Sequence, residues 1–177
     1  MFMPADRNTW LSKGLEVLAE DGFQSLKVDI LCRKLGLTKG SFYHHFKDRG
    51  HFMEELLAYW EADYTSRPIG LAEEGAGPLE MFEILSSVAA EVPKGPEIAI
   101  RTWAQFDPIA RSYQERVDRR RLEYLETLIG GITNDPERSE VLASLVLAVY
   151  VGAHQVIPPF NQNQLRVVLD EIRERLL

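Results

Sequence analysis

Apolar residues recur along this chain at the spacing of a helix rather than in the alternation of a strand. Within residues 7–21, Leu11, Leu15 and Leu18 form one stripe three or four positions apart. Residues 141–157 (VLASLVLAVYVGAHQVI) are apolar nearly all round, which is typical of a buried helix and slightly too short to span a bilayer. We therefore predict an all-α fold of about nine helices without a sheet.

Caps and chain breakers indicate where these helices begin and end. Gly22 and Gly36 suit helix stops because glycine adopts a positive φ without steric cost, and Thr38 and Asp48 suit N-caps. Proline and glycine around 67–78 predict a break. The predicted helices span 7–21, 28–35, 38–46, 49–64, 79–91, 97–104, 108–129, 136–155 and 162–177.

The segment LTKGSFYHHF (37–46) places few apolar residues among many polar ones. Two short helices meet at Gly36, and Phe42 and Phe46 then point to the core while the other face carries small or polar side chains. This pattern predicts a helix-turn-helix whose second helix enters the major groove of double-stranded DNA. The candidate DNA-binding residues are Thr38, Lys39, Gly40, Ser41, Tyr43, His44, Lys47 and Arg49.

The segments LAEDGF (18–23) and VDILCRKLGLTKGSFYHHFKDRGHF (28–52), with the amphipathic helix that follows, resemble the DNA-binding head of the TetR family of bacterial transcriptional regulators. The resemblance covers residues 7–57. Lys27 departs from the usual Thr or Ser, so we expect a longer cationic DNA contact there. Cys32 replaces the usual alanine and is expected to be a small buried residue.

Charge is distributed unevenly between the two predicted domains. The formal net charge is −7, yet residues 1–50 hold eight Lys/Arg against six Asp/Glu, so the excess of acid lies in residues 51–177. We expect 1–50 to be the DNA-binding domain and 51–177 the ligand-sensing and dimerisation domain. The single cysteine and the absence of a signal-peptide pattern favour the cytoplasm.

Large side chains in residues 81–113 are candidates for a pocket that binds an apolar or weakly polar small ligand, although they equally fit a helical core. These are Met81, Phe82, Trp103, Phe106 and Tyr113. The last two predicted helices are candidates for a homodimer built as a four-helix bundle, an arrangement that the family resemblance also implies. Its candidate residues are Leu142, Leu145, Val146, Val149, Leu165, Val168, Leu169 and Ile172.

Other chemistry finds little support. We see no nucleotide-binding glycine loop or hydrolase motif, and we expect no enzyme activity and no cofactor. His44 and His45 diverge by 100° on a helix, which disfavours a metal site. The run 119–121 (RRR) is interpreted as an exposed, salt-bridged helix face, and Arg101 as part of an ion pair.

The sequence thus predicts a ligand-responsive dimeric repressor that a small molecule releases from its operator, with no membrane partner. The alternative is a helical DNA-binding or interaction protein without small-molecule sensing.

Overall fold

The computed structural model describes residues 6–176, and all regular structure in that range is helical, as predicted. The fold divides into two compact units. The first combines the chain up to Ala62 with Pro93–Gln114, and the second combines Asp63–Val92 with the chain from Glu115 onward. These units are defined by contacts and do not coincide with the predicted boundary at residue 50. That boundary divides a DNA-binding part from a ligand-sensing and dimerisation part, and it stays a prediction. The predicted end of the last helix, Leu177, lies outside the described residues.

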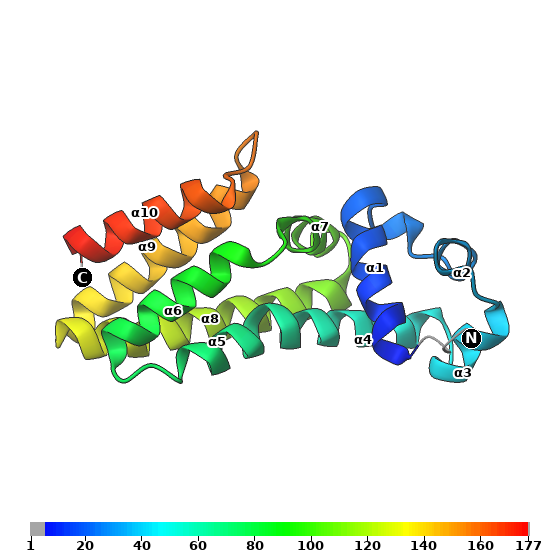
Figure 1. Cartoon of the computed structure of the whole chain (residues 1–177), viewed down its shortest axis with the longest axis horizontal. Coiled ribbons are helices and arrows are strands. Elements are labelled where there is room, and N and C mark those ends of the chain that lie inside the picture. The colour runs from blue at the N-terminus through cyan, green and yellow to red at the C-terminus, as the bar shows by residue number, and fades with distance from the viewer. Residues whose placement is uncertain (1–5, 177) are drawn as a thin grey trace. The chain divides into compact units, whose positions relative to one another are not determined.

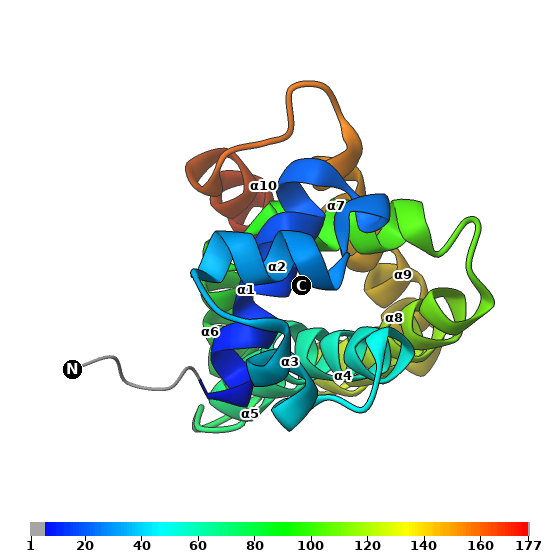
Figure 2. The same ribbon diagram turned by 90° about the vertical axis from the view of Figure 1, so that its right-hand side faces the viewer.

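The first unit is organised around its first helix. α1 lies against α2, α4 and α7, and α2 contacts α3 (Figures 1 and 2). The elements of this unit are α1 (Arg7–Asp21), a 3₁₀ turn η1 (Phe23–Ser25), α2 (Val28–Leu35), α3 (Lys39–His45), α4 (Arg49–Glu61) and α7 (Lys94–Trp103). It also contains the beginning of α8 (Pro108–Thr133).

The predicted caps and stops of α2, α3 and α4 are confirmed. Gly36 is left-handed, with φ 66° and ψ 29°, where a residue with a Cβ would be strained. The Thr38 side chain accepts a hydrogen bond from the Ser41 N–H at 3.2 Å, and Asp48 accepts one from the His51 N–H at 2.8 Å. These local bonds satisfy amides that a short helix leaves without intrahelical partners.

Phe42 lies at the centre of the aromatic core of this unit. Its ring centroid is 5.4 Å from those of Trp10 and Phe52 and 5.1 Å from that of Phe46, and all four side chains are buried. These rings belong to α1, α3, the residue after α3, and α4. The predicted inward orientation of Phe42 and Phe46 is therefore confirmed.

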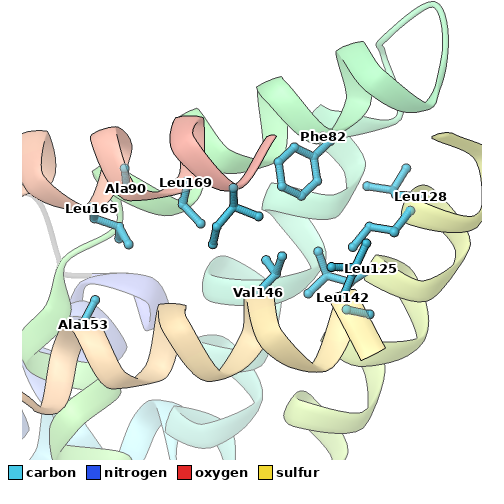
Figure 3. Packing of buried hydrophobic residues seen from close by; sticks show 12 residues of the cluster. Phe82, Ala90, Leu125, Leu128, Leu142, Val146, Ala153, Leu165 and Leu169 are labelled. Atoms are coloured by element: carbon cyan, nitrogen blue, oxygen red, sulfur yellow. The ribbon is translucent and has the colours of Figure 1, made fainter. Parts of the chain in front are cut away.

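The second unit is a layered packing of helices around one apolar cluster. α6 contacts α5 and α10, and α9 contacts α10. Figure 3 shows Val146 of α9 and Leu169 of α10 projecting into the same core, with Phe82 beside them. The elements are a π-helical segment η2 (Ala62–Ser66), α5 (Arg67–Ala72), α6 (Pro78–Glu91), the later part of α8, α9 (Pro136–Gln155) and α10 (Gln162–Leu176).

Helix breaks were predicted at Pro68, Pro96 and Gly130–Gly131, but these residues lie within helices. The described residues form ten α-helices, and α5 occupies part of the predicted break. Pro68 lies in the first turn of α5, where its missing N–H costs nothing. Pro96 lies in the first turn of α7, which begins three residues earlier than predicted.

The pair Gly130–Gly131 does not end α8, which continues to Thr133. A Cβ on Gly131 would lie 2.7 Å from Pro78 Cγ, so glycine permits close packing of α8 against the start of α6. The stop is Asn134, which has φ 53° and donates its N–H to the Gly130 carbonyl. Helix α4 also ends earlier than predicted, at Glu61, where the π-helical segment takes over.

Most of the predicted dimer residues belong to the core of the second unit itself. Leu145 is 40% exposed, whereas Val149 and Val168 are partly buried. The buried ones are Leu142, Val146, Leu165, Leu169 and Ile172. These five residues pack with α6 and α8 within one chain, and a homodimer built from α9 and α10 stays a prediction. Within residues 6–176, no helix is both long and apolar enough to cross a membrane.

We expect Gly14→Ala to destabilise the first unit. A Cβ there would lie 2.7 Å from Phe52 Cζ and 2.9 Å from Leu56 Cδ1, so these two side chains of α4 would have to shift within the packed core. Overpacking of this kind costs about 1–3 kcal/mol, more than the ~1 kcal/mol that alanine gains over glycine in a helix. Thermal unfolding should show a lower midpoint.

Gly70→Ala is the matched control. Gly70 is also helical, but a Cβ there would meet nothing within 4 Å, so this variant should be neutral or more stable. Equal effects of the two substitutions would contradict the close approach of α1 and α4.

Candidate nucleic-acid interface and internal pocket

The surface of α3 and its flanks exposes the predicted DNA-contacting side chains. Tyr43 is 54% exposed, and Ser41 is partly covered. The others, Lys27, Thr38, Lys39, Gly40, His44, Lys47 and Arg49, are exposed. The seven-residue helix thus buries Phe42 and turns small and polar groups outward. Among the described residues, no group of three or more His, Cys, Asp or Glu is placed to hold a metal ion.

Lys39 forms an ion pair that the sequence reading missed. Its Nζ lies 2.7 Å from Asp29 Oδ1, which joins the first turn of α3 to the first turn of α2. The hydrogen bond and charge of Asp29 raise the pKa of Lys39, so the ammonium stays protonated at neutral pH. A phosphate that binds Lys39 must therefore compete with a carboxylate of this chain.

Arg49 and Lys27 frame the same surface from the ends of neighbouring helices. Arg49 Nε donates to the Leu26 carbonyl at 2.6 Å, which ties the start of α4 to the connection before α2. Lys27 is the N-cap residue of α2 and makes no side-chain capping bond, so α2 begins without the hydroxyl cap usual at this position. Arg49 consequently has a structural task besides any contact with DNA.

Cys32 matches its predicted structural role. Its side chain is buried on α2, and burial raises the pKa of the thiol. A neutral thiol reacts slowly, so this cysteine is held in an inert form.

A separate cavity of about 70 Å³ lies within the second unit. Its wall is mainly apolar, with a few aromatic and polar side chains. The lining residues are Tyr64, Thr65, Pro68, Ile69, Phe82, Leu85, Ser86, Ala89, Arg121, Tyr124, Leu125, Val146, Leu147, Tyr150 and Leu169. Such a concave, mostly apolar site with a few polar groups is typical of small-molecule binding.

Arg121 enters this pocket instead of lying on an exposed face. Its Nε donates to Thr65 Oγ1 at 3.1 Å, its Nη2 donates to the Tyr64 carbonyl at 3.2 Å, and its guanidinium lies 5.5 Å from the Tyr150 ring centroid. The interpretation of 119–121 as a uniform solvated face was therefore wrong for Arg121. The available signal was helical spacing, because Arg121 precedes the apolar Tyr124 and Leu125 by three and four residues.

Tyr124 presents a buried hydroxyl for which the described residues supply no hydrogen-bond partner. Burial is the main cause that raises the pKa of this phenol, and the charge of Glu73 adds to it. The group is therefore a neutral donor at physiological pH. Since a buried polar group without a partner is costly, this hydroxyl is an uncommon feature of the pocket wall.

The five predicted ligand residues do not gather around one cavity. Phe82 lines the pocket, and Met81 packs against the neighbouring core. Trp103, Phe106 and Tyr113 belong to the first unit.

The pocket in the second unit does not include these three side chains among its lining residues, so the expectation that a ligand binds near them stays a prediction. Trp103 is buried and stacks on Phe23 at 6.0 Å between centroids, whereas Phe106 is 76% exposed. Tyr113 is partly buried. Arg101 instead forms the predicted ion pair, with its Nη2 3.0 Å from Oε1 of buried Glu97.

Comparison with known proteins now adds to this geometry. Residues 11–56, which contain most of α1 to α4, match the family of bacterial regulatory proteins called the tetR family. Through this segment the chain is similar to the TetR family, and the matched residues contain the helix-turn-helix of α2 and α3.

Two curated TetR-type relatives show different extents of similarity. The transcriptional regulator AcuR of Cereibacter sphaeroides is 31% identical over 80 residues, which cover 44% of this chain and only 36% of AcuR. The HTH-type transcriptional regulator BetI of Proteus mirabilis is 22% identical over 168 residues, covering 89% of this chain and 84% of BetI. Both relatives are transcriptional regulators by name.

The fold also extends over the whole chain in solved structures. A transcriptional regulator from Saccharomonospora viridis, crystallised with choline, superposes with a TM-score of 0.78 at 16% identity. The superposition covers 96% of this chain and 95% of that one. At this identity the likeness establishes the fold alone.

We expect Asp29→Asn to strengthen the binding of double-stranded DNA. The substitution removes a negative charge near the groove and frees Lys39 from its competing carboxylate. A gain of about 2- to 10-fold at low salt, shrinking as salt rises, would fit an exposed charge. Fluorescence anisotropy with labelled duplexes measures it.

Asp21→Asn is the control for net charge, because Asp21 pairs with Lys34 at 3.1 Å and not with Lys39. If both variants gained equally, overall charge would account for the effect and the local competition would be refuted.

Proposed function

We propose that this regulator is a homodimeric repressor whose α3 helices bind operator DNA and whose pocket binds a small molecule that releases it. The observation that carries the proposal is the presence, in one chain, of an exposed helix-turn-helix and a lined cavity. The cavity favours sensing over the alternative of a DNA-binding protein without a ligand, since a non-sensing bundle has no need of unfilled space.

The DNA contacts follow from the surface of α3. Gly40 and Ser41 are small and allow close approach to base edges, while Lys39, Tyr43 and Arg49 supply donors for phosphates on either side. Two copies of this helix in a dimer would occupy successive major grooves. The operator should therefore be a palindrome with half-sites about 34–36 Å apart.

The π-helical segment offers a route from ligand to DNA-binding helix. Tyr64 and Thr65 line the pocket and follow α4 directly in the chain, within Ala62–Ser66. Segments of π-helix inside α-helices are frequent at functional sites. A ligand that favours one of two arrangements of this segment would reorient α4, and a coupling of ~1–3 kcal/mol would weaken DNA binding about 5- to 150-fold.

The outer face of α9 is the proposed dimer contact. Val141 is 68% exposed and Leu145 is 40% exposed. The small residues Ser144, Ala148 and Gly152 continue the same stripe, and a Cβ on Gly152 would meet nothing within 4 Å. Such a face of apolar and small side chains allows a second helix to approach closely.

We expect Lys39→Ala to weaken operator and non-operator DNA alike. The operator is first selected from a random pool of duplexes, and binding is then measured across salt concentrations. Loss of one phosphate contact should lower the salt slope by roughly 0.9. Failure of the wild-type protein to enrich any sequence would overturn the proposed operator binding.

Lys34→Ala is the control for Lys39→Ala. Lys34 is also on the helix-turn-helix, but Glu20 and Asp21 hold its ammonium towards the end of α1. The salt slope of this variant should stay at the wild-type value. Loss of sequence discrimination in Lys39→Ala, with non-specific affinity intact, would refute the phosphate role.

We expect Leu145→Asp to convert the dimer to a folded monomer in analytical ultracentrifugation. A charge on an apolar contact face loses burial worth roughly 1.5–3 kcal/mol per leucine and must be desolvated. Val146→Asp should instead unfold the second unit, because Val146 is buried in its core.

Ile109→Asp is the matched control for Leu145→Asp. Ile109 is similarly exposed, at 46%, but lies on α8 in the first unit, so this variant should remain dimeric. A dimeric Leu145→Asp protein would exclude the outer face of α9.

A further inference from the structure

Building on the proposed sensing role, we infer that the pocket of the second unit takes a small uncharged molecule with an oxygen atom that accepts a hydrogen bond from the Tyr124 hydroxyl. The same walls disfavour a quaternary ammonium ligand such as choline. The inference rests on the size of the cavity, the unmet donor and the charge of the lining.

Size limits the part of a ligand that the cavity can enclose. An apolar cavity of about 150 Å³ holds benzene. The present cavity, at about 70 Å³, is partly open, so it encloses a few carbon atoms of a ligand and leaves the remainder of a ring at its opening. Phe82, Leu125, Val146 and Leu169 supply apolar contacts to such a group.

The Tyr124 hydroxyl sets the polar requirement. Tyr124 is a lining residue of the pocket, and its hydroxyl is buried beside the pocket wall without a hydrogen-bond partner among the described residues. Because its phenol stays protonated, it can donate to a carbonyl, ether or hydroxyl oxygen. An acceptor on the ligand restores a bond that the protein alone leaves unmade, whereas a pure hydrocarbon does not.

The lining also selects against a cation. Arg121 is the one formally charged side chain among the lining residues. Its guanidinium already lies over the Tyr150 ring, so the aromatic face that would attract a ligand ammonium holds a cation of the protein itself. A positively charged ligand would meet a like charge in an apolar enclosure, which is costly.

An anion is disfavoured for a different reason. Two donors of Arg121 are directed to Thr65 Oγ1 and to the Tyr64 carbonyl, where they hold the π-helical segment. A carboxylate would have to draw them away and be desolvated among leucine and valine side chains. An uncharged acceptor leaves these bonds in place.

The test compares cyclopentanone, cyclopentane and choline as probes of the full-length protein. Binding is read from the methyl NMR signals of Val146 and Leu169, which line the pocket. We expect Tyr124→Phe to weaken cyclopentanone roughly 3- to 10-fold, the effect of one hydrogen bond, and to leave cyclopentane unaffected. Choline should leave these methyl signals unshifted at the same concentration.

Ser86→Ala is the matched control, because it removes another hydroxyl from the same wall. It should leave the affinity of both ring compounds unchanged. Tyr124→Phe should also keep or raise the melting temperature, since it removes an unmet donor. A lower melting temperature, an unchanged affinity for cyclopentanone, or choline binding at these methyl groups would each overturn the inference.

Operator affinity, measured with and without cyclopentanone, separates this inference from the sensing role. Tyr124-dependent binding that lowers operator affinity supports both. Tyr124-dependent binding that leaves operator affinity unchanged supports the pocket chemistry and overturns release by this ligand class. Absence of cyclopentanone binding overturns the inference, while operator selection and the Lys39→Ala salt slope still decide whether the chain binds DNA as proposed.

Discussion

The burial of Phe42 is the contact on which the presentation of α3 depends. A helix of seven residues is far below the ~12–15 at which isolated helices become even marginal in water. It forms here because one ring is held between Trp10 and Phe52 while Thr38 caps the first turn. Since a single large side chain anchors the helix, the remaining positions are available for small and polar groups. The outward positions of α3 therefore contribute little to its packing against the core.

The second unit differs from the first because polar groups lie within its apolar packing. Arg121 lies against an apolar wall, and its burial there is offset because the Thr65 hydroxyl and the Tyr64 carbonyl accept hydrogen bonds from its guanidinium. The same bonds stabilise a π-helical segment whose backbone pattern departs from that of the helices on either side. Regular packing is thus interrupted at one place, and the cavity lies beside it.

Local features of the fold could be predicted from the sequence, whereas features set by tertiary contact could not. The roles of Gly36, Thr38 and Asp48 depend only on their own backbone or on the next few residues, so these roles could be predicted from the sequence. Gly131 was misjudged because its function is the proximity of Pro78, more than fifty residues away.

Arg121 was misplaced for the same reason, since its hydroxyl partner, Thr65, is distant in sequence. The apolar residues of α9 indicated that the helix is buried, but they did not indicate whether it packs against the same chain or against a second copy.

The ion pair between Lys39 and Asp29 has a consequence for how a DNA-binding protein of this kind finds its site. Non-operator sites vastly outnumber operators, and the binding of a protein to non-operator DNA is almost wholly electrostatic. In the proposed complex with DNA, the Asp29 carboxylate weakens the contact of Lys39 with phosphate at operator and non-operator sites alike, and it does not act on contacts to base edges. Each wrong site then retains the protein for a shorter time, and a search along the chromosome passes more sites per second. Asp29 would thus lower the affinity for DNA and at the same time shorten the search for the operator.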